Sequence, residues 1–323
     1  MTLLAPLSNS TSAGTGRPGR TARPSWFGWL CMMAFAVCEA EQLPRDAGAL
    51  EGKVGLNHVY VVLDEETFAA ARDSEVLLKE FASVDTGLPT FAPPQADSQR
   101  LYIRGKTTYV ELLGPRNPFN EPVGKVGLAL GVDALPLLDV VQAAWSASLG
   151  AAADRYNVEW KRATPARPWY EVVQHRSTSA NPHLVVWASA YRSEFLPWLY
   201  PQRPAHENRG SRADFLAPLF RPERLFQDVT ALTIAVPEEL RQQIARQLQA
   251  VGYRRTERGE GLELQGAGLT LTLLASSAHR QGLLSMTVAM NREGAADIAL
   301  GARSAIEFDT RSALWRFRKE TWQ

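Results

Sequence analysis

The stretch GLNHVYVVLD, residues 55–64, decides the fold, because it is typical of a short buried strand that leads into a helix. Residues 65–82, EETFAAARDSEVLLKEFA, place apolar side chains at roughly helical spacing. The runs RLYIRG and TTYVELLGP, residues 100–105 and 107–115, alternate with a period of two and predict a hairpin. The stretch also places His58 among aliphatic neighbours. Three interpretations of this histidine remain open: a metal ligand, a ligand-binding group, or an ordinary half-buried histidine.

The same order of elements begins twice more along the chain. KVGLALGVD, residues 125–133, precedes an amphipathic run and the strand-like segments YNVEWKRA, WYEVVQHRS and HLVVWASAYR. DVTALTIAV, residues 228–236, precedes another helical run and the segments GLELQG, LTLTLLA and LLSMTVAM. Three units of similar length indicate an internal repeat. We therefore expect two paired modules over residues 41–193, and a third module of strand-helix-strand type with a C-terminal hairpin over residues 223–323.

A connecting loop is expected between these parts, over residues 194–222, which are rich in Pro, Arg and aromatic residues. Loops of this length are usually functional or disordered. Two interpretations remain open: an ordered linker that packs Phe195, Trp198 and Phe215 against a neighbouring surface, or a lid over a substrate.

The bulk composition is that of a soluble protein with a large core. The chain has 323 residues, of which 45% are hydrophobic and 21% charged, and its formal charge is +1. Since residues 1–40 hold three arginines and one glutamate, the remainder carries about one net negative charge. No basic field is left to attract nucleic acid or an anionic membrane, so neither is expected as a partner.

The N-terminal residues 1–40 have the pattern of a signal peptide. A basic region precedes the uncharged run at residues 26–38, and Ala40 is a candidate cleavage point. The run is shorter than a transmembrane helix requires. An uncleaved N-terminal anchor is the alternative interpretation. We expect a periplasmic or secreted protein with no other membrane contact. Both cysteines, Cys31 and Cys38, lie in this segment, so the mature chain would have no cysteine nucleophile and no disulfide.

Side chains alternate across a strand, which divides each strand of the first unit into two faces. One face is aliphatic and is expected to pack under the helix. The opposite face collects polar and ionisable groups, and with two aromatic residues of the second unit it forms a candidate ligand-binding surface. Its members are His58, Tyr60, Tyr102, Arg104, Tyr109, Glu111, Trp187 and Tyr191.

Small residues stand opposite this surface in the second unit, at Gly127, Ala129 and Gly131. They would leave room for a small molecule between two facing walls. The alternative is that they only let two sheets approach closely.

For Glu111 and Arg104, two residues of this surface, the sequence predicts specific interactions. A carboxylate such as Glu111 in the middle of a buried strand is costly without a partner. Arg104 is the expected ion-pair partner, although it is also a natural partner for an anionic ligand. A catalytic Glu111 would need a raised pKa, which an adjacent arginine opposes.

The motifs HVYVVLD, YVELLGP and VGLALGV, in this order and spacing, resemble the glyoxalase and bleomycin-resistance proteins of the vicinal oxygen chelate superfamily. The chain is most similar to an uncharacterised group of bacterial glyoxalase-like proteins of unknown function. The resemblance covers residues 54–190, and extends to about residue 318 if the third unit is an added half-module. It implies modules that form a cup and, in metal-dependent members, one ligand from the first strand and one from the last strand of each module.

The resemblance implies His58 and Glu111 as ligands of a divalent metal such as zinc, manganese or iron. The second unit departs from the pattern, because Gly127 stands where the first unit has His58, and LVVWASAYR holds no carboxylate. In the third unit the equivalent residues are Ala231 and Thr272. Superfamily members without ligands often bind compounds rather than transform them.

We therefore expect an α+β fold, in which mainly antiparallel sheets of repeated strand-helix-strand modules curl into a cup, with a third half-module added. The favoured function is binding of a small organic molecule by an exported protein. A divalent-metal-dependent lyase, isomerase or dioxygenase is one alternative, and a structural or partner-binding protein with a decayed site is another. The ligand and the oligomeric state stay open.

Overall fold

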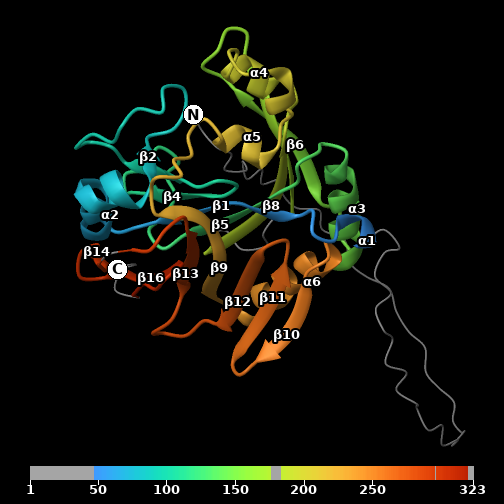
Figure 1. Ribbon diagram of the computed structural model, residues 1–323. Helices are drawn as coiled ribbons and strands as arrows, with labels where there is room; N and C mark the ends of the chain where they lie inside the picture. The colour runs from blue at the N-terminus through green and yellow to red at the C-terminus, as the bar shows by residue number, and fades with distance from the viewer. Residues whose placement is uncertain (1–46, 176–182, 295, 319–323) are drawn as a thin grey trace, which may run out of the picture. The chain divides into compact units, whose positions relative to one another are not determined.

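The structure, a computed structural model, describes residues 47–175, 183–294 and 296–318 (Figure 1). The predicted signal peptide, residues 1–40, lies outside the described residues. Residues 43–323 form one unit, and every element below belongs to it. Within the described part of the chain, no helix combines the length and the apolar character that crossing a membrane requires.

The first sheet is built from the two units that the sequence predicts at the start of the chain. It has eight strands in the order β2-β3-β4-β1-β5-β8-β7-β6. The first module consists of β1 (Gly55–Val62), α2 (Glu65–Asp73), β2 (Ser83–Asp85), β3 (Arg100–Arg104) and β4 (Tyr109–Leu113), with α1 (Ala47–Leu50) before it and a short π-helix, η1 (Leu77–Phe81), after α2. The second module consists of β5 (Val126–Gly131), α3 (Leu137–Leu149), β6 (Asp154–Trp160), β7 (Arg167–Gln174) and β8 (Leu184–Tyr191). Strands β1 and β5 pair antiparallel at the centre and join the two modules.

The change from strand to helix in the first module is encoded at Asp64. Its carboxylate accepts hydrogen bonds from the backbone N–H and the hydroxyl of Thr67, at 3.0 and 2.8 Å, and so caps α2. The cap explains why the strand stops at the aspartate that closes the opening stretch. Because the helix returns the chain to the start of the sheet, β4 runs parallel to β1.

The second sheet also has eight strands, in the order β10-β11-β12-β9-β13-β16-β15-β14. Its first module repeats the same order of elements: β9 (Phe226–Val236), α6 (Glu238–Ala250), β10 (Arg254–Arg258), β11 (Gly261–Gly266) and β12 (Leu269–Ala275). A further set of strands completes it: β13 (Gly282–Met290), β14 (Ile298–Ala299), β15 (Ser304–Phe308) and β16 (Ser312–Phe317). The last two form the predicted C-terminal hairpin.

The strand assignment in this part differs from the sequence pattern. Strand β10 was not expected, because its residues RRTER are mostly exposed and charged, as suits an edge strand. Strand β13 does not close the third module but begins a fourth module, in which the described residues form no helix. Without a helix, the chain passes directly from the end of β13 into β14. As a result the last strand of this module, β16, runs antiparallel to its first strand, β13. In the third module, which has a helix, the last strand, β12, runs parallel to the first, β9. A complete second sheet stands where the pattern suggests a half-module.

The core lies on the helix-facing sides of the two sheets and is continuous between them. Val59 and Val61 of β1 share one cluster of buried side chains with Leu232 and Ile234 of β9. Two buried hydrogen bonds cross the interface, from the indole of Trp145 to the carbonyl of Gln247 at 2.9 Å and from Tyr253 to Val54 at 3.0 Å. The α+β class with mainly antiparallel sheets in a glyoxalase-like module order is therefore confirmed, and the sheets are open at their edges.

The segment over residues 194–222, expected as a loop, carries three short helices: α4 (Phe195–Leu199), η2 (Ala205–Glu207) and α5 (Arg212–Leu216). The hydroxyl of Ser211 and the carboxylate of Asp214 form a capping box at the start of α5. Phe195 and Phe215 are buried in a second cluster, on the side of the first sheet that faces away from the core.

Candidate functional site

The strand register places all eight predicted site residues on the face of the first sheet opposite the core, which we call the aromatic face. His58 pairs across the strands with Tyr109, and Tyr109 pairs with Arg104. In the next row, Glu111 lies between Tyr60 and Tyr102. Trp187 and Tyr191 of β8 complete the surface, since their neighbours in the strand belong to the core. The predicted shared face of His58 and Glu111 is thus present.

A ninth residue, Asn57, joins this face through a β-bulge. The register of β1 against β5 shifts between Leu56 and His58, so strict alternation breaks at this point. Leu56 belongs to the core, whereas the Asn57 side chain hydrogen-bonds to Tyr191. Asn57 is 5% exposed, and its Oδ1 atom has no hydrogen-bond partner among the described residues. Alternation alone assigns Asn57 to the core side, and no sequence pattern predicts the bulge. Sequence reasoning therefore missed this residue.

Glu111 is 7% exposed and hydrogen-bonds to the hydroxyl of Tyr102. Its Oε1 atom has no partner among the described residues. Burial raises the pKa of Glu111, and the hydrogen bond from Tyr102 and the charges of two arginines offset this only in part. The carboxyl group therefore has the property that an acid-base role requires.

The expected ion pair between Arg104 and Glu111 is wrong. The guanidinium of Arg104 donates to both oxygens of Asp85, from Nε at 2.7 Å and from Nη2 at 2.8 Å. It also lies over the rings of Tyr102 and Tyr109, at 4.5 and 5.0 Å from their centroids. The side chains of Arg104 and Asp85 are only 2% and 6% exposed. Since its charge is already compensated, Arg104 is also not a free partner for an anionic ligand.

His58 stacks on Tyr109, with ring centroids 4.4 Å apart and an interplanar angle of 18°, and it meets the edge of Trp187 at 5.5 Å. Its Nδ1 atom is buried without a partner among the described residues. Burial, and secondly the charge of Arg104, lower the pKa of His58 to about 3. His58 is therefore neutral near pH 7, and both aromatic contacts are available to an uncharged imidazole.

The small residues of β5 do not leave an open space. A Cβ atom built on Gly127 would lie 2.0 Å from a carbon of the Tyr60 ring, so this ring covers the glycine. A Cβ atom on Gly131 would lie 2.7 Å from Cδ of Arg212. Side chains therefore fill the space over both glycines, so neither an open gap nor a close approach of two sheets is found at these positions.

The aromatic face is covered by the segment over residues 194–222. Phe215 stacks on Tyr191 with centroids 4.9 Å apart and tilts toward Tyr109 at 6.4 Å. Arg212 fastens the segment, because it donates to both carboxylate oxygens of Asp133 at 3.0 Å and to the carbonyl of Leu56 at 2.8 Å. A molecule that reaches the buried polar atoms of this face has to displace this cover.

The metal site that the resemblance implies needs more ligands than this face supplies. Registers of β1 with β4 and of β5 with β8 place Gly127 at the position of His58, and Trp187 at the position of Glu111. Of four positions, two hold side chains that bind metals. In the described residues, no group of three or more His, Cys, Asp or Glu side chains is placed to hold a metal ion. The residues present do not fit the full ligand set, and we derive no chemical step through a metal.

Fold and site together define an α+β protein of glyoxalase-like architecture with a covered aromatic face. The chain belongs to a family described as "Family of unknown function (DUF5829)", whose pattern it matches over residues 56–317. No curated protein matches the chain.

Solved structures with a similar fold are distant from the chain. A hypothetical protein from Staphylococcus aureus is 8% identical, with 71% of this chain and 88% of that chain covered and a TM-score of 0.41. A fusion of a xylose isomerase-like TIM barrel with 4-hydroxyphenylpyruvate dioxygenase is 12% identical, with 72% and 35% covered and a TM-score of 0.39. A catechol 2,3-dioxygenase is 12% identical, with 71% and 74% covered and a TM-score of 0.39.

Proposed function

We propose that the protein binds a small, uncharged organic molecule with a planar part on the aromatic face of the first sheet. One observation carries the proposal: three buried polar atoms, Asn57 Oδ1, His58 Nδ1 and Glu111 Oε1, lack partners among the described residues. His58 and Glu111 come from neighbouring strands and face the same side, and the bulge in β1 turns Asn57 toward this side as well.

Leaving such groups without hydrogen bonds costs about 1–3 kcal/mol each, so an unpaired group in a native protein calls for an explanation. A chance packing defect explains one such atom more readily than three on one surface. A ligand with both donors and acceptors would satisfy them together. The rings of Tyr109 and Trp187 beside His58 supply surface on which a planar group stacks.

The charges favour an uncharged ligand. Asp85 compensates Arg104, and His58, with a pKa of about 3, is neutral near pH 7. Burial raises the pKa of Glu111, which disfavours its negative form. An anionic ligand would therefore lose its hydration without meeting a free cation.

The probes that test this are benzamide and benzoate, which share size and planarity but differ in charge. Calorimetric titration should show benzamide binding at least about tenfold more tightly than benzoate, equivalent to ~1.4 kcal/mol. Glu111→Leu, which removes a hydrogen-bonding group but keeps the volume, should weaken benzamide binding. Leu112→Met, at the neighbouring position on the core side of β4, is the control. Binding of benzoate alone, or of neither probe, would leave the decayed-site alternative.

A metal-dependent lyase, isomerase or dioxygenase is the second candidate, because His58 and Glu111 share the face. Metal analysis after purification with zinc, manganese or iron separates the two. Near-stoichiometric metal that is lost in both His58→Ala and Glu111→Ala would favour the enzyme. A protein without tightly bound metal that still binds benzamide would favour the binder.

Export is part of the proposal and is supported by the pattern of residues 1–40. Cell fractionation of the full chain, with the N-terminal sequence of the mature protein, tests it. Mature protein that starts near residue 41 in the periplasm or medium is expected, and full-length protein in the cytoplasm would contradict it.

A further inference from the structure

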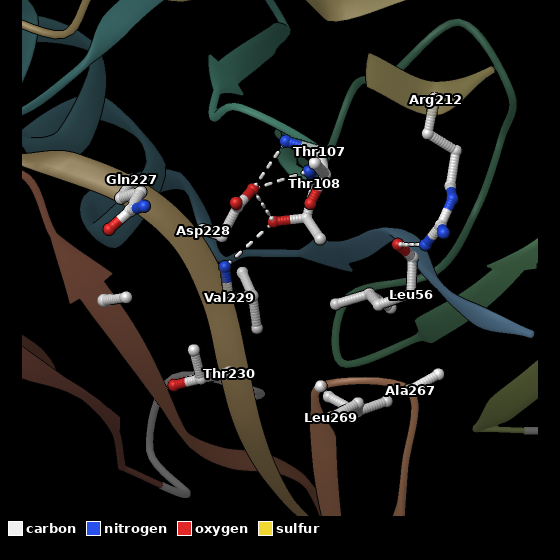
Figure 2. A pocket seen from close by; sticks show the side chains of 12 residues that line it. Leu56, Thr107, Thr108, Arg212, Gln227, Asp228, Val229, Thr230, Ala267 and Leu269 are labelled. Atoms are coloured by element: carbon white, nitrogen blue, oxygen red, sulfur yellow. Dashed lines mark hydrogen bonds between the residues drawn. The ribbon is translucent and has the colours of Figure 1, made fainter. Parts of the chain in front are cut away.

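A cavity of about 250 Å³ lies between the two sheets, and none of the residues of the aromatic face lines it. Figure 2 shows its walls, which come from β1, the β3–β4 turn, α5, β9, the β11–β12 turn, the start of β12, and β13. This volume is far above the ~10–15 Å³ that a single water molecule needs. The cavity therefore has room for a small organic molecule.

Asp228 of β9 forms one polar wall of the cavity. Its Oδ1 atom accepts hydrogen bonds from the backbone N–H groups of Thr107 and Thr108, both at 2.7 Å, and from the Thr108 hydroxyl at 3.0 Å (Figure 2). The same hydroxyl accepts from the N–H of Val229 at 2.8 Å. Among the described residues, none donates to Asp228 Oδ2 and none forms an ion pair with Asp228. The carboxylate is thus held in place through one oxygen, while the other is free for a ligand.

Arg212, the cationic residue that lines the cavity, does not compensate the negative charge of Asp228. Arg212, which Figure 2 places apart from Asp228 beside Leu56, is already paired with Asp133 through two hydrogen bonds of 3.0 Å. Its Nη1 atom donates to the carbonyl of Leu56 at 2.8 Å. The uncompensated charge of the cavity is therefore negative.

The remaining walls are partly polar, at Gln227 and Thr230, and partly aliphatic. The aliphatic part consists of Leu56 of β1, Val229 of β9, Leu269 of β12 and Ala289 of β13, with Ala267 beside Leu269. Contact with these aliphatic side chains stabilises a ligand that has an apolar part. A metal ion, bare or hydrated, has no such part.

We propose that this cavity is a second ligand site, which takes a small organic amine. The ammonium group donates to Asp228 Oδ2, and the apolar body packs on the aliphatic walls. The inference is independent of the function proposed for the aromatic face, because the two sites share no residue that binds a ligand.

The test uses benzylamine and its neutral analogue benzyl alcohol, followed by the backbone amide resonances of Thr107 and Thr108. Because both amides donate to Asp228, a cation at its free oxygen should shift them. Benzylamine should bind at least about tenfold more tightly than benzyl alcohol. Asp228→Asn keeps the accepting Oδ1 atom and removes the charge, so this preference should disappear in that variant.

A second variant guards against loss of structure in Asp228→Asn. Ala289→Leu fills the cavity from β13, at the position paired across the strands with Asp228, and it should abolish benzylamine binding. Ala299→Leu, the same change at an exposed position of β14, should leave binding intact. Equal affinities for the two probes, binding that survives Ala289→Leu, or amide shifts that potassium chloride reproduces would each overturn the proposal.

Discussion

The guanidinium of Arg104 and the carboxylate of Asp85 form a buried two-pronged ion pair, with N–O distances of 2.7 and 2.8 Å. The pair decides the electrostatics of the aromatic face. Because Asp85 compensates Arg104, burial dominates at Glu111 and raises the pKa of its carboxyl group. The backbone N–H of Gly87 donates to Asp85 at 2.6 Å and helps to hold the pair in place.

Asp85→Asn should lower the free energy of unfolding by ~3–5 kcal/mol, because it leaves a buried guanidinium without a compensating charge. Urea denaturation monitored by circular dichroism measures the loss. Asp73→Asn, which breaks the exposed pair with Arg72, is the matched control and should cost at most ~1 kcal/mol. Equal effects of the two substitutions would show that the buried pair has no special weight.

Gly127→Ala should destabilise the protein by ~1–3 kcal/mol, because the new methyl group overlaps the ring of Tyr60. The double variant Gly127→Ala with Tyr60→Ala should lose less stability than the sum of the losses in the two single variants, because the ring that the new methyl group overlaps is no longer there. Gly48→Ala, where the added carbon meets nothing within 4 Å, should have no such cost. Additive costs at Gly127 and Tyr60 would contradict the observed contact.

The free energy of unfolding should depend on pH because His58 has different pKa values in the folded and unfolded states. Its pKa is about 3 in the folded protein, against an ordinary value of 6.5 for histidine, so the unfolded chain binds an extra proton between these values. Stability is therefore lost as the pH falls from about 6.5 toward 3. His58→Gln should lose less stability over this range, and the control His183→Gln, at an exposed position, should behave like the wild type.

Glu111 acts in the opposite direction. Its raised pKa means that the folded state binds the proton more tightly, so its contribution to stability declines as the pH rises above the ordinary glutamate pKa of 4.5. Glu111→Gln should gain stability relative to the wild type as the pH rises from this value toward neutrality. A constant difference across this range would contradict the raised pKa.

Arg212→Met should loosen the cover of the aromatic face. Loss of hydrogen bonds to a charged group costs ~1.5–3 kcal/mol, which corresponds to at least about tenfold faster amide exchange. Hydrogen exchange followed by mass spectrometry should localise the change to residues 194–222. Arg209→Met, at an exposed position before α5, is the control. Unchanged exchange in this segment would mean that Arg212 does not fasten it.

Hydrophobic periodicity predicted the first sheet well. All strands of both modules except β2, and the shared face of His58 and Glu111, followed from alternation, because one side of each strand is buried against a helix. The same rule missed β10, whose charged residues carry no alternation.

The site was predicted only in part. The bulge that turns Asn57 toward Tyr191 depends on the pairing of two strands and has no local signal. Asp85 lies in a strand of three residues, so nothing marked it as the partner of Arg104 nineteen positions away. The aromatic cover was among the expected alternatives, but its fastening by Arg212 is a tertiary contact that joins distant segments.

The central claim is that three unpartnered polar atoms bind an uncharged organic molecule. A crystal structure of the complex with benzamide tests it most directly. We predict the amide group within hydrogen-bond distance, ~3 Å, of at least two of the atoms Asn57 Oδ1, His58 Nδ1 and Glu111 Oε1, with residues 194–222 displaced or closed over it. Benzamide bound elsewhere, or an aromatic face that stays closed and empty at saturating benzamide, would contradict the account.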